Sequence, residues 1–397
     1  MNNNQLHSSQ NRGATQTNPT QPYSQTRRPA RRKSKAEIAR RLFFAKCVIA
    51  VCMTLVLGGV VYLLCRSGLF SKSSSKKESS ITSLTSVITS AVPSSEESSA
   101  APTELPADMS GYTVILDPGH GGWDRGTSYP FNSDQNEEPT ITIKIAGYLK
   151  EELESRGAKV YVTRTEDNYY SLYYRLAEVH LICMDIAKER GILPFSADRE
   201  QELRSLLQKI KDVNDNSYEK GGMGFMAGTG AGPELKELFE MEYQLTNVVF
   251  ISIHLNAHYT DDGQPVDHHG IEVTYVTDDA VNEYEGKPKN QTAGAPVREA
   301  YHGRPNEHNL LFCQTLYDAI IADTPALKSN MDKPVYTANW AVIRKTGLVG
   351  TLLEFGFISH ETDRAILQDE AALKVVCSSV ADGIEEYFKQ IGVNTTA

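Results

Sequence analysis

Short apolar runs alternate with longer segments of helical periodicity between residues 111 and 393. The strand-like runs are Thr113 to Leu116, Lys159 to Thr163, Val248 to His254, Gly270 to Val276 and Val349 to Glu354. The helix-like segments are Pro139 to Ser155, Leu172 to Glu178, Asn309 to Ile321 and Glu361 to Phe388. This alternation predicts a folded α/β domain over 111–393, with helices on both faces of a sheet.

One segment of this domain, about 181–246, is too long for a simple connection between a helix and a strand. Such connections usually take about 2 to 6 residues. Two helix-like pieces, Ala197 to Val213 and Pro233 to Leu245, flank the glycine run "GGMGFMAGTGAG". That run lacks the G-x-x-x-x-G-K-[ST] pattern of a phosphate-binding loop. We therefore interpret 181–246 as a helical insertion.

The first 110 residues divide into three parts of different composition. Residues 1–41 are polar and basic without apolar periodicity, which is typical of a disordered tail. Residues 42–66 contain the uncharged stretch "CVIAVCMTLVLGGVVYLLC", whose 19 residues would span roughly 28 Å as a helix. It predicts one transmembrane helix, with a cleaved signal peptide as the alternative. Residues 67–110 are rich in Ser and Thr and predict a flexible linker.

Charge along the chain gives the expected orientation and excludes one class of partner. Residues 1–66 carry eleven Lys or Arg and one acid, whereas the whole chain has a net charge of -10. Basic residues favour the cytoplasmic side of a membrane, so we expect the N-terminus in the cytoplasm and the domain outside, on the cell-wall side. The acidic remainder lacks the basic surface that nucleic acid binding requires.

Cysteine usage does not indicate a disulfide framework. Cys47, Cys52 and Cys65 lie in or next to the predicted membrane segment. The other three are Cys183, Cys313 and Cys377, which are widely spaced and form no C-x-x-C pair. We expect these three to fill core positions, although one disulfide outside the membrane is an open alternative.

Three chemically active residues lie at the ends of predicted strands. His120 follows the first strand in "VILDPGHGG", His254 ends "VVFISIH", and Glu354 ends "VGTLLE". In open α/β sheets, ligands bind beyond the carboxyl ends of the strands. We therefore expect these three side chains to lie near one another.

A fourth candidate is Glu138, at the start of the helix-like segment. Pro139 suits the first turn of a helix, which places Glu138 at the cap position, and Glu137 competes for the same role. Catalytic zinc takes three ligands from His and acidic residues and keeps one position open. His120, Glu138 and His254 would form such a set.

In this arrangement Glu354 would be left to accept and return a proton. A single histidine after a strand is more often structural than metal-binding. His258 is the most plausible false candidate, and His268 and His269 are typical of a polar loop.

Several blocks of the chain resemble a known family in order and spacing. They are "VILDPGHGGWDRGT", "EEPTITIKIA", "YVTRTEDNYYSLYYRLAE", "FISIHLNAH", "GIEVTYV" and "WAVIRKTGLVGTLLEFGFISHETDRAIL". Together they resemble the zinc-dependent N-acetylmuramoyl-L-alanine amidases, also called amidase type 3, over nearly all of 111–390. The resemblance implies a mixed sheet flanked by helices, and one Zn²⁺ ion held by His120, Glu138 and His254. It selects Glu138 over Glu137 and implies that Glu354 is catalytic.

The implied reaction is hydrolysis of the amide between N-acetylmuramic acid and L-alanine in peptidoglycan. A zinc peptidase or deacylase acting on another wall amide is the alternative enzyme, and a non-catalytic wall-binding regulatory module is the alternative from another class. The chain departs from the family pattern in its insertion at 181–246, in a longer loop at 278–307, and at His360, where Asn is usual. The insertion could be a lid or gate controlled by a regulatory protein, or additional surface packing.

Overall fold

The computed structural model describes residues 108–392, except 219, 221, 286, 288–294 and 302. The predicted basic tail, the predicted transmembrane helix and nearly all of the predicted linker lie outside the described residues. Within the described part, no helix combines the length and the apolar character that crossing a bilayer would need.

The domain is built around a six-stranded mixed sheet, which confirms the expected fold class. The strands are β1 (Thr113–Pro118), β2 (Lys159–Val162), β3 (Val248–Asn256), β4 (Glu272–Tyr275), β5 (Val335–Thr337) and β6 (Val349–Phe357). Their order is β2-β1-β3-β6-β4-β5, in which β2, β1, β3 and β6 run parallel and β4 runs antiparallel to β6. The five predicted strands are present, and β5, whose three residues show no alternation, was missed.

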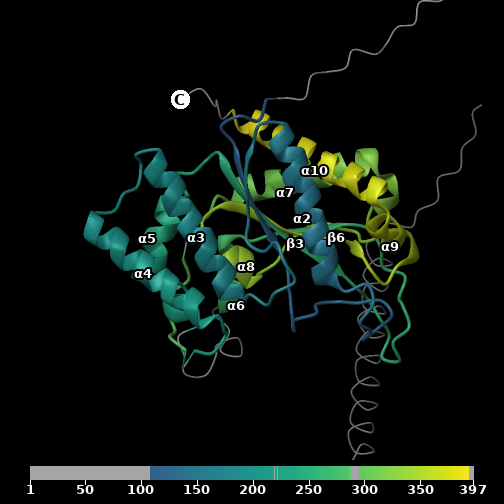
Figure 1. Ribbon diagram of the computed structural model, residues 1–397, viewed down its shortest axis with the longest axis horizontal. Coiled ribbons are helices and arrows are strands. Elements are labelled where there is room, and N and C mark those ends of the chain that lie inside the picture. The colour runs from purple at the N-terminus through teal and green to yellow at the C-terminus, as the bar shows by residue number, and fades with distance from the viewer. Residues whose placement is uncertain are drawn as a thin grey trace, which may run out of the picture. The chain divides into compact units, whose positions relative to one another are not determined.

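Helices cover both faces of the sheet (Figure 1). One face is packed by α2 (Glu138–Ser155), α7 (Asn306–Asp323) and α10 (Glu370–Ile391), with α9 (Glu361–Gln368) beside β6. The other face is packed by α3 (Leu172–Glu189), α4 (Ala197–Val213) and α5 (Pro233–Glu242). The shorter elements are α6 (Asp278–Glu285), α8 (Ala341–Arg344), and the 3-10 turns η1 (Gly224–Met226) and η3 (Pro325–Leu327).

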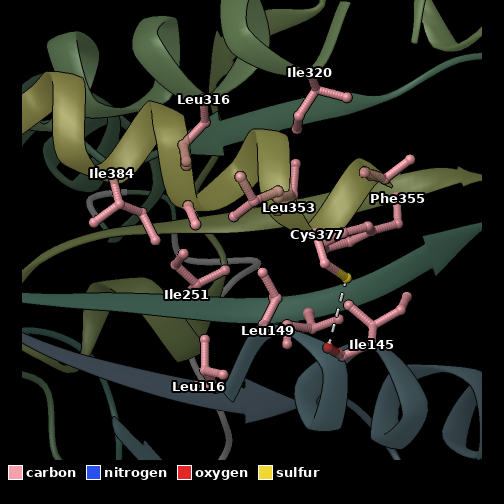
Figure 2. Close-up of a cluster of buried hydrophobic side chains, with 14 of the residues drawn as sticks. Leu116, Ile145, Leu149, Ile251, Leu316, Ile320, Leu353, Phe355, Cys377 and Ile384 are labelled. Carbon is pink, nitrogen blue, oxygen red and sulfur yellow. Dashed lines mark hydrogen bonds between the residues drawn. The ribbon is translucent and has the colours of Figure 1, made fainter. Parts of the chain in front are cut away.

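Figure 2 shows the apolar core between the sheet and α2, α7 and α10. Leu116, Ile251 and Leu353 come from three neighbouring strands and meet helix side chains such as Ile145 and Ile384. These side chains are fully buried. The core therefore holds the strands that end at the candidate site in a fixed register.

Cysteines occupy core positions, as the sequence predicts. Cys183, Cys313 and Cys377 are buried and free. The Sγ atom of Cys377 lies 3.9 Å from the carbonyl oxygen of Ile145, in the contact drawn in Figure 2. The alternative of a disulfide among these three is therefore wrong.

The insertion forms a substantial part of the second core. Buried apolar residues of α4, η1 and α5, such as Leu207, Met226 and Phe239, pack in one cluster with Ile115 and Phe250 of the sheet. This packing favours the interpretation that 181–246 stabilises the fold. Asn214 donates a hydrogen bond to the backbone oxygen of Tyr169, which links the insertion to the loop after β2. This contact does not test whether the insertion closes over the site, so the gating hypothesis stays a prediction.

Two predicted helices differ in extent from those observed. The predicted helix from Leu172 to Glu178 continues to Glu189. The predicted helix from Glu361 to Phe388 is two helices, because Asp369 has extended backbone angles and caps α10 by accepting a hydrogen bond from the Ala372 amide at 2.8 Å. An N-cap carboxylate of this kind begins a new helix at the point where the chain bends.

Candidate metal centre

The expected convergence of strand ends is present in the sheet. β3 lies between β1 and β6, and His254 is paired directly with Glu354 in the parallel register of β3 and β6. His120 follows the end of β1, where Pro118 is paired with Ile253. The three strand ends therefore deliver His120, His254 and Glu354 to the same edge of the sheet.

His120, Glu138 and His254 form a group of three potential metal ligands. Their donor atoms all lie within 4.8 Å of one another. The Nε2 atom of His120 lies 3.3 Å from Oε2 of Glu138, and Nδ1 of His254 lies 2.9 Å from Oε1 of the same carboxylate. The two imidazole rings meet edge to face at 4.9 Å between their centres. Glu138 thus lies between two histidines, one on each carboxylate oxygen.

The helix start that carries Glu138 differs by one residue from the prediction. Glu137 is the N-cap residue, and Glu138 is the first residue of α2. Glu138 is 2% exposed, and its carboxylate accepts hydrogen bonds from the backbone amides of Thr127 at 2.8 Å and Leu255 at 2.9 Å. Glu137 instead forms an ion pair with Arg125. Two backbone amides therefore fix the Glu138 carboxylate, whereas Glu137 lies outside the ligand group.

The protonation states of this group follow from burial and mutual attraction. Burial raises the pKa of Glu138, but hydrogen bonds and charges from His120 and His254 outweigh it and hold that pKa well below its usual value. Burial lowers the pKa of His120, but Asp124 and Glu138 outweigh it and raise that pKa to about 10. In the metal-free protein, the anionic Glu138 therefore stabilises the protonated His120, whose positive charge serves in place of that of a metal ion.

Glycines in the turn after β1 permit this close approach. His120 itself has a positive φ of 62°, which is uncommon for a residue with a side chain. A Cβ atom at Gly126 would lie 2.3 Å from Oε2 of Glu138, and one at Gly119 would lie 2.3 Å from the His254 ring. The glycines beside His120 thus leave room for the ligand side chains.

Asp124 orients His120 from the side away from Glu138. Its Oδ1 atom lies 2.9 Å from Nδ1 of His120. A carboxylate on one ring nitrogen selects the tautomer and leaves the other nitrogen, here Nε2, available to a metal. Asp124 was not predicted from the sequence, although its position four residues after His120 was a usable signal.

Arg164 was also missed, and it joins the two segments that carry His120 and Glu138. Its side chain is 1% exposed. The guanidinium donates hydrogen bonds to the carbonyl oxygens of Gly119 at 2.7 Å and Pro118 at 3.3 Å, and to Pro139 at 3.4 Å. The contacts involve backbone oxygens, so a sequence motif alone could not reveal them.

Glu354 lies beside the ligand group, and its carboxyl group has a raised pKa. Burial and the negative charges of Glu138 and Glu272 raise the pKa of Glu354 well above its usual value. Glu272 is paired with Glu354 across β4 and β6. The Oε2 atom of Glu354 is buried and has no hydrogen-bond partner within the part of the chain that the structure describes. Such an atom suits a role in binding or proton transfer.

These residues fit a divalent metal ion. Two imidazoles and one carboxylate form the three-ligand set of a catalytic zinc site, and the separations of 2.9 and 3.3 Å allow one ion to contact all three. Among the described residues, this group does not include His258, whose ring packs against that of His268 with 4.4 Å between their centres. The structure thus brings the four residues predicted from the sequence to one edge of the sheet, and His258 is not part of the ligand group.

Known proteins similar to this chain support the same family. "Probable cell wall amidase LytH" of Staphylococcus epidermidis is 25% identical over 291 residues, which are 72% of this chain and 63% of that relative. The Staphylococcus aureus protein of that name is 45% identical over 121 residues, which are 29% of this chain and 39% of the relative. The matches therefore span less than two thirds of these relatives.

Two solved structures are similar to this chain at lower sequence identity. An N-acetylmuramoyl-L-alanine amidase from Clostridium difficile is 20% identical, with 72% of this chain and 98% of that chain covered and a TM-score of 0.40. Ami1 of Mycobacterium smegmatis is 14% identical, with 72% and 100% covered and a TM-score of 0.40. The family model described as N-acetylmuramoyl-L-alanine amidase matches residues 114–185 and 206–386. The chain therefore belongs to the amidase type 3 family.

Proposed function

We propose that this protein is a zinc-dependent N-acetylmuramoyl-L-alanine amidase that cleaves the amide between N-acetylmuramic acid and L-alanine in peptidoglycan. The observation that carries the proposal is the buried Glu138 carboxylate between His120 and His254, with Glu354 at the same sheet edge. Family membership supplies the reaction class, and the donor set supports zinc as the cofactor.

His120, Glu138 and His254 would hold the ion, and Asp124 would keep Nε2 of His120 directed toward it. A bound zinc ion polarises a carbonyl and makes water more acidic. Glu354 would take a proton from the attacking water and return it to the leaving nitrogen. With a dication beside it, Glu354 would have a lower pKa than in the metal-free protein, which suits a group that both accepts and donates a proton.

The location and partners of the enzyme are part of the proposal. Residues 42–66 would cross the membrane once, with the N-terminus in the cytoplasm and the catalytic domain on the cell-wall side. Residues 67–110 would then tether the domain within reach of peptidoglycan. The charge of the chain and its family argue against nucleic acid as a partner. A regulatory protein acting on 181–246 stays a prediction.

Product identification tests both the bond and the metal. Purified peptidoglycan is incubated with the full-length protein, with and without a chelator, and the soluble products are identified by mass spectrometry. We expect stem peptides with a free L-alanine amino terminus, and we expect the chelator to abolish their release until zinc is restored. Cleavage within the stem peptide would instead indicate a zinc peptidase. Release of the same products in the presence of the chelator would exclude a catalytic metal.

A further inference from the structure

A second group of potential metal ligands lies outside the proposed active site. It consists of Asp267, His269 and His360, whose donor atoms lie within 4.8 Å of one another. Asp267 and His269 belong to the connection between β3 and β4, and His360 is the N-cap residue of α9 after β6. The rings of His269 and His360 are stacked at 4.7 Å between their centres.

Distances within this group match a shared ion better than they match hydrogen bonds. Oδ1 of Asp267 lies 3.5 Å from Nδ1 of His269 and 3.6 Å from Nε2 of His360. Direct N–H···O bonds usually measure about 2.7 to 3.2 Å. Two ligand atoms on one tetrahedral zinc lie roughly 3.4 Å apart, since Zn–N and Zn–O bonds are each about 2.0 to 2.2 Å. The Asp267 oxygen therefore lies at the spacing of a coordination shell from a nitrogen of each imidazole.

An unpartnered buried carboxylate supports the same interpretation. Asp363 is fully buried, and its Oδ2 atom accepts hydrogen bonds from the amides of Gly270 at 2.7 Å and Phe357 at 2.8 Å. Its Oδ1 atom has no hydrogen-bond partner among the described residues, and it lies 3.5 Å from Nδ1 of His360. Histidines that bind metals commonly direct their other ring nitrogen toward such a carboxylate. Nδ1 of His360 is likewise without a hydrogen-bond partner among the described residues, so Asp363 faces one ring nitrogen across 3.5 Å while the other, Nε2, lies 3.6 Å from Asp267.

The donor set indicates which ions would bind. Two imidazole nitrogens and one carboxylate suit Zn²⁺ and related transition metals, whereas Mg²⁺ and Ca²⁺ prefer oxygen ligands. Asp267 is 85% exposed, so an ion could enter from solvent and keep an open position. None of these residues belongs to the group formed by His120, Glu138 and His254. We propose that Asp267, His269 and His360 form a second transition-metal site, which binds Zn²⁺ and joins the loop after β3 to the start of α9.

The number of zinc ions bound by the full-length protein tests this site. Protein freed of metal by a chelator is titrated with ZnCl₂ in a calorimeter, and bound zinc is then measured by elemental analysis. We expect two ions per chain in the wild type and one in His360→Asn and Asp267→Asn. His268→Asn, which changes the neighbouring histidine of the same loop, is the matched control and should retain two.

Asp267→Asn is the decisive variant, because so exposed a side chain can be changed without disturbing the core. Retention of the full wild-type number of ions by a folded Asp267→Asn protein would overturn the second site. Glu138→Gln separates this outcome from failure of the active-site proposal. In one outcome, the wild type binds a single ion that is lost in Asp267→Asn and retained in Glu138→Gln. That result would support the second site and reject the first.

Discussion

Replacement of Arg164 by Met should weaken both the fold and zinc binding. Met keeps an unbranched side chain about as long as the stem of Arg up to Nε, but removes every hydrogen bond of the guanidinium. Arg164 donates to Gly119, Pro118 and Pro139, and also to the Glu166 carbonyl at 3.1 Å and the Thr142 hydroxyl at 3.2 Å. These bonds connect the turn of His120 with the start of the helix that carries Glu138.

The magnitude follows from the geometry of these bonds. Burial and the nearby Arg175 lower the pKa of Arg164 to about 10, so the guanidinium remains charged at neutral pH. The bond to Gly119 is short at 2.7 Å, and buried bonds to a charged group contribute about 1.5 to 3 kcal/mol each. Loss of the longer hydrogen bonds adds to this cost in stability. Removal of the buried positive charge also removes its desolvation penalty, which offsets part of the cost. We expect the free energy of unfolding to fall by about 2 to 4 kcal/mol.

Urea denaturation followed by circular dichroism measures this loss, and competition with a coloured chelator measures zinc affinity. Because Arg164 acts on the ligands through their backbone, we expect zinc affinity to fall by about 10-fold to 100-fold. Arg199→Met is the matched control, since Arg199 also donates several hydrogen bonds, in its case to the carboxylates of Glu237 and Glu202, but is partly exposed. It should cost only about 0 to 1 kcal/mol. If Arg164→Met loses no more than Arg199→Met and binds zinc normally, Arg164 does not position the site.

Three further predictions concern the site itself. Glu354→Gln should retain zinc but lower kcat by about 10²-fold to 10⁴-fold in a peptidoglycan release assay, because the amide cannot accept a proton. Because its pKa is raised to about 10, His120 is protonated near pH 7, and zinc binding should release that proton. Zinc affinity should therefore rise with pH up to about 10. Calorimetry in buffers of different ionisation enthalpy measures the number of protons released. Asp124→Asn should weaken zinc binding by about 10-fold to 100-fold in chelator competition, because it frees the His120 ring.

Each of these predictions has a result that contradicts it. Full activity of Glu354→Gln would assign the proton transfer to another group. Zinc binding that releases no proton and is independent of pH would mean that His120 is neutral in the metal-free protein. For Asp124, the control is Asp134→Asn, an exposed carboxylate in the same connection between β1 and α2. Equal zinc affinity in the two variants would show that Asp124 does not orient the ring.

Local sequence patterns predicted much of the architecture. Apolar runs identified β1, β2, β3, β4 and β6, because a buried strand or helix face requires a periodic apolar pattern that is visible in the chain itself. The pattern failed at Asp369, where an N-cap carboxylate interrupts a continuous helical periodicity. It also failed at β5, which is too short for a period to appear.

The sequence by itself determined the residue types of the site and their positions at the ends of strands and at the start of a helix. Only the tertiary structure decided that Glu138 meets His254, which is 116 residues away, because this contact depends on the order β1-β3-β6. It also decided the roles of Arg164, which binds the backbone of Gly119, and of Asp363, which binds the backbone amide of Gly270, 93 residues away. Periodicity reports the environment of each segment, whereas contacts between segments arise only when the core closes and fixes their register.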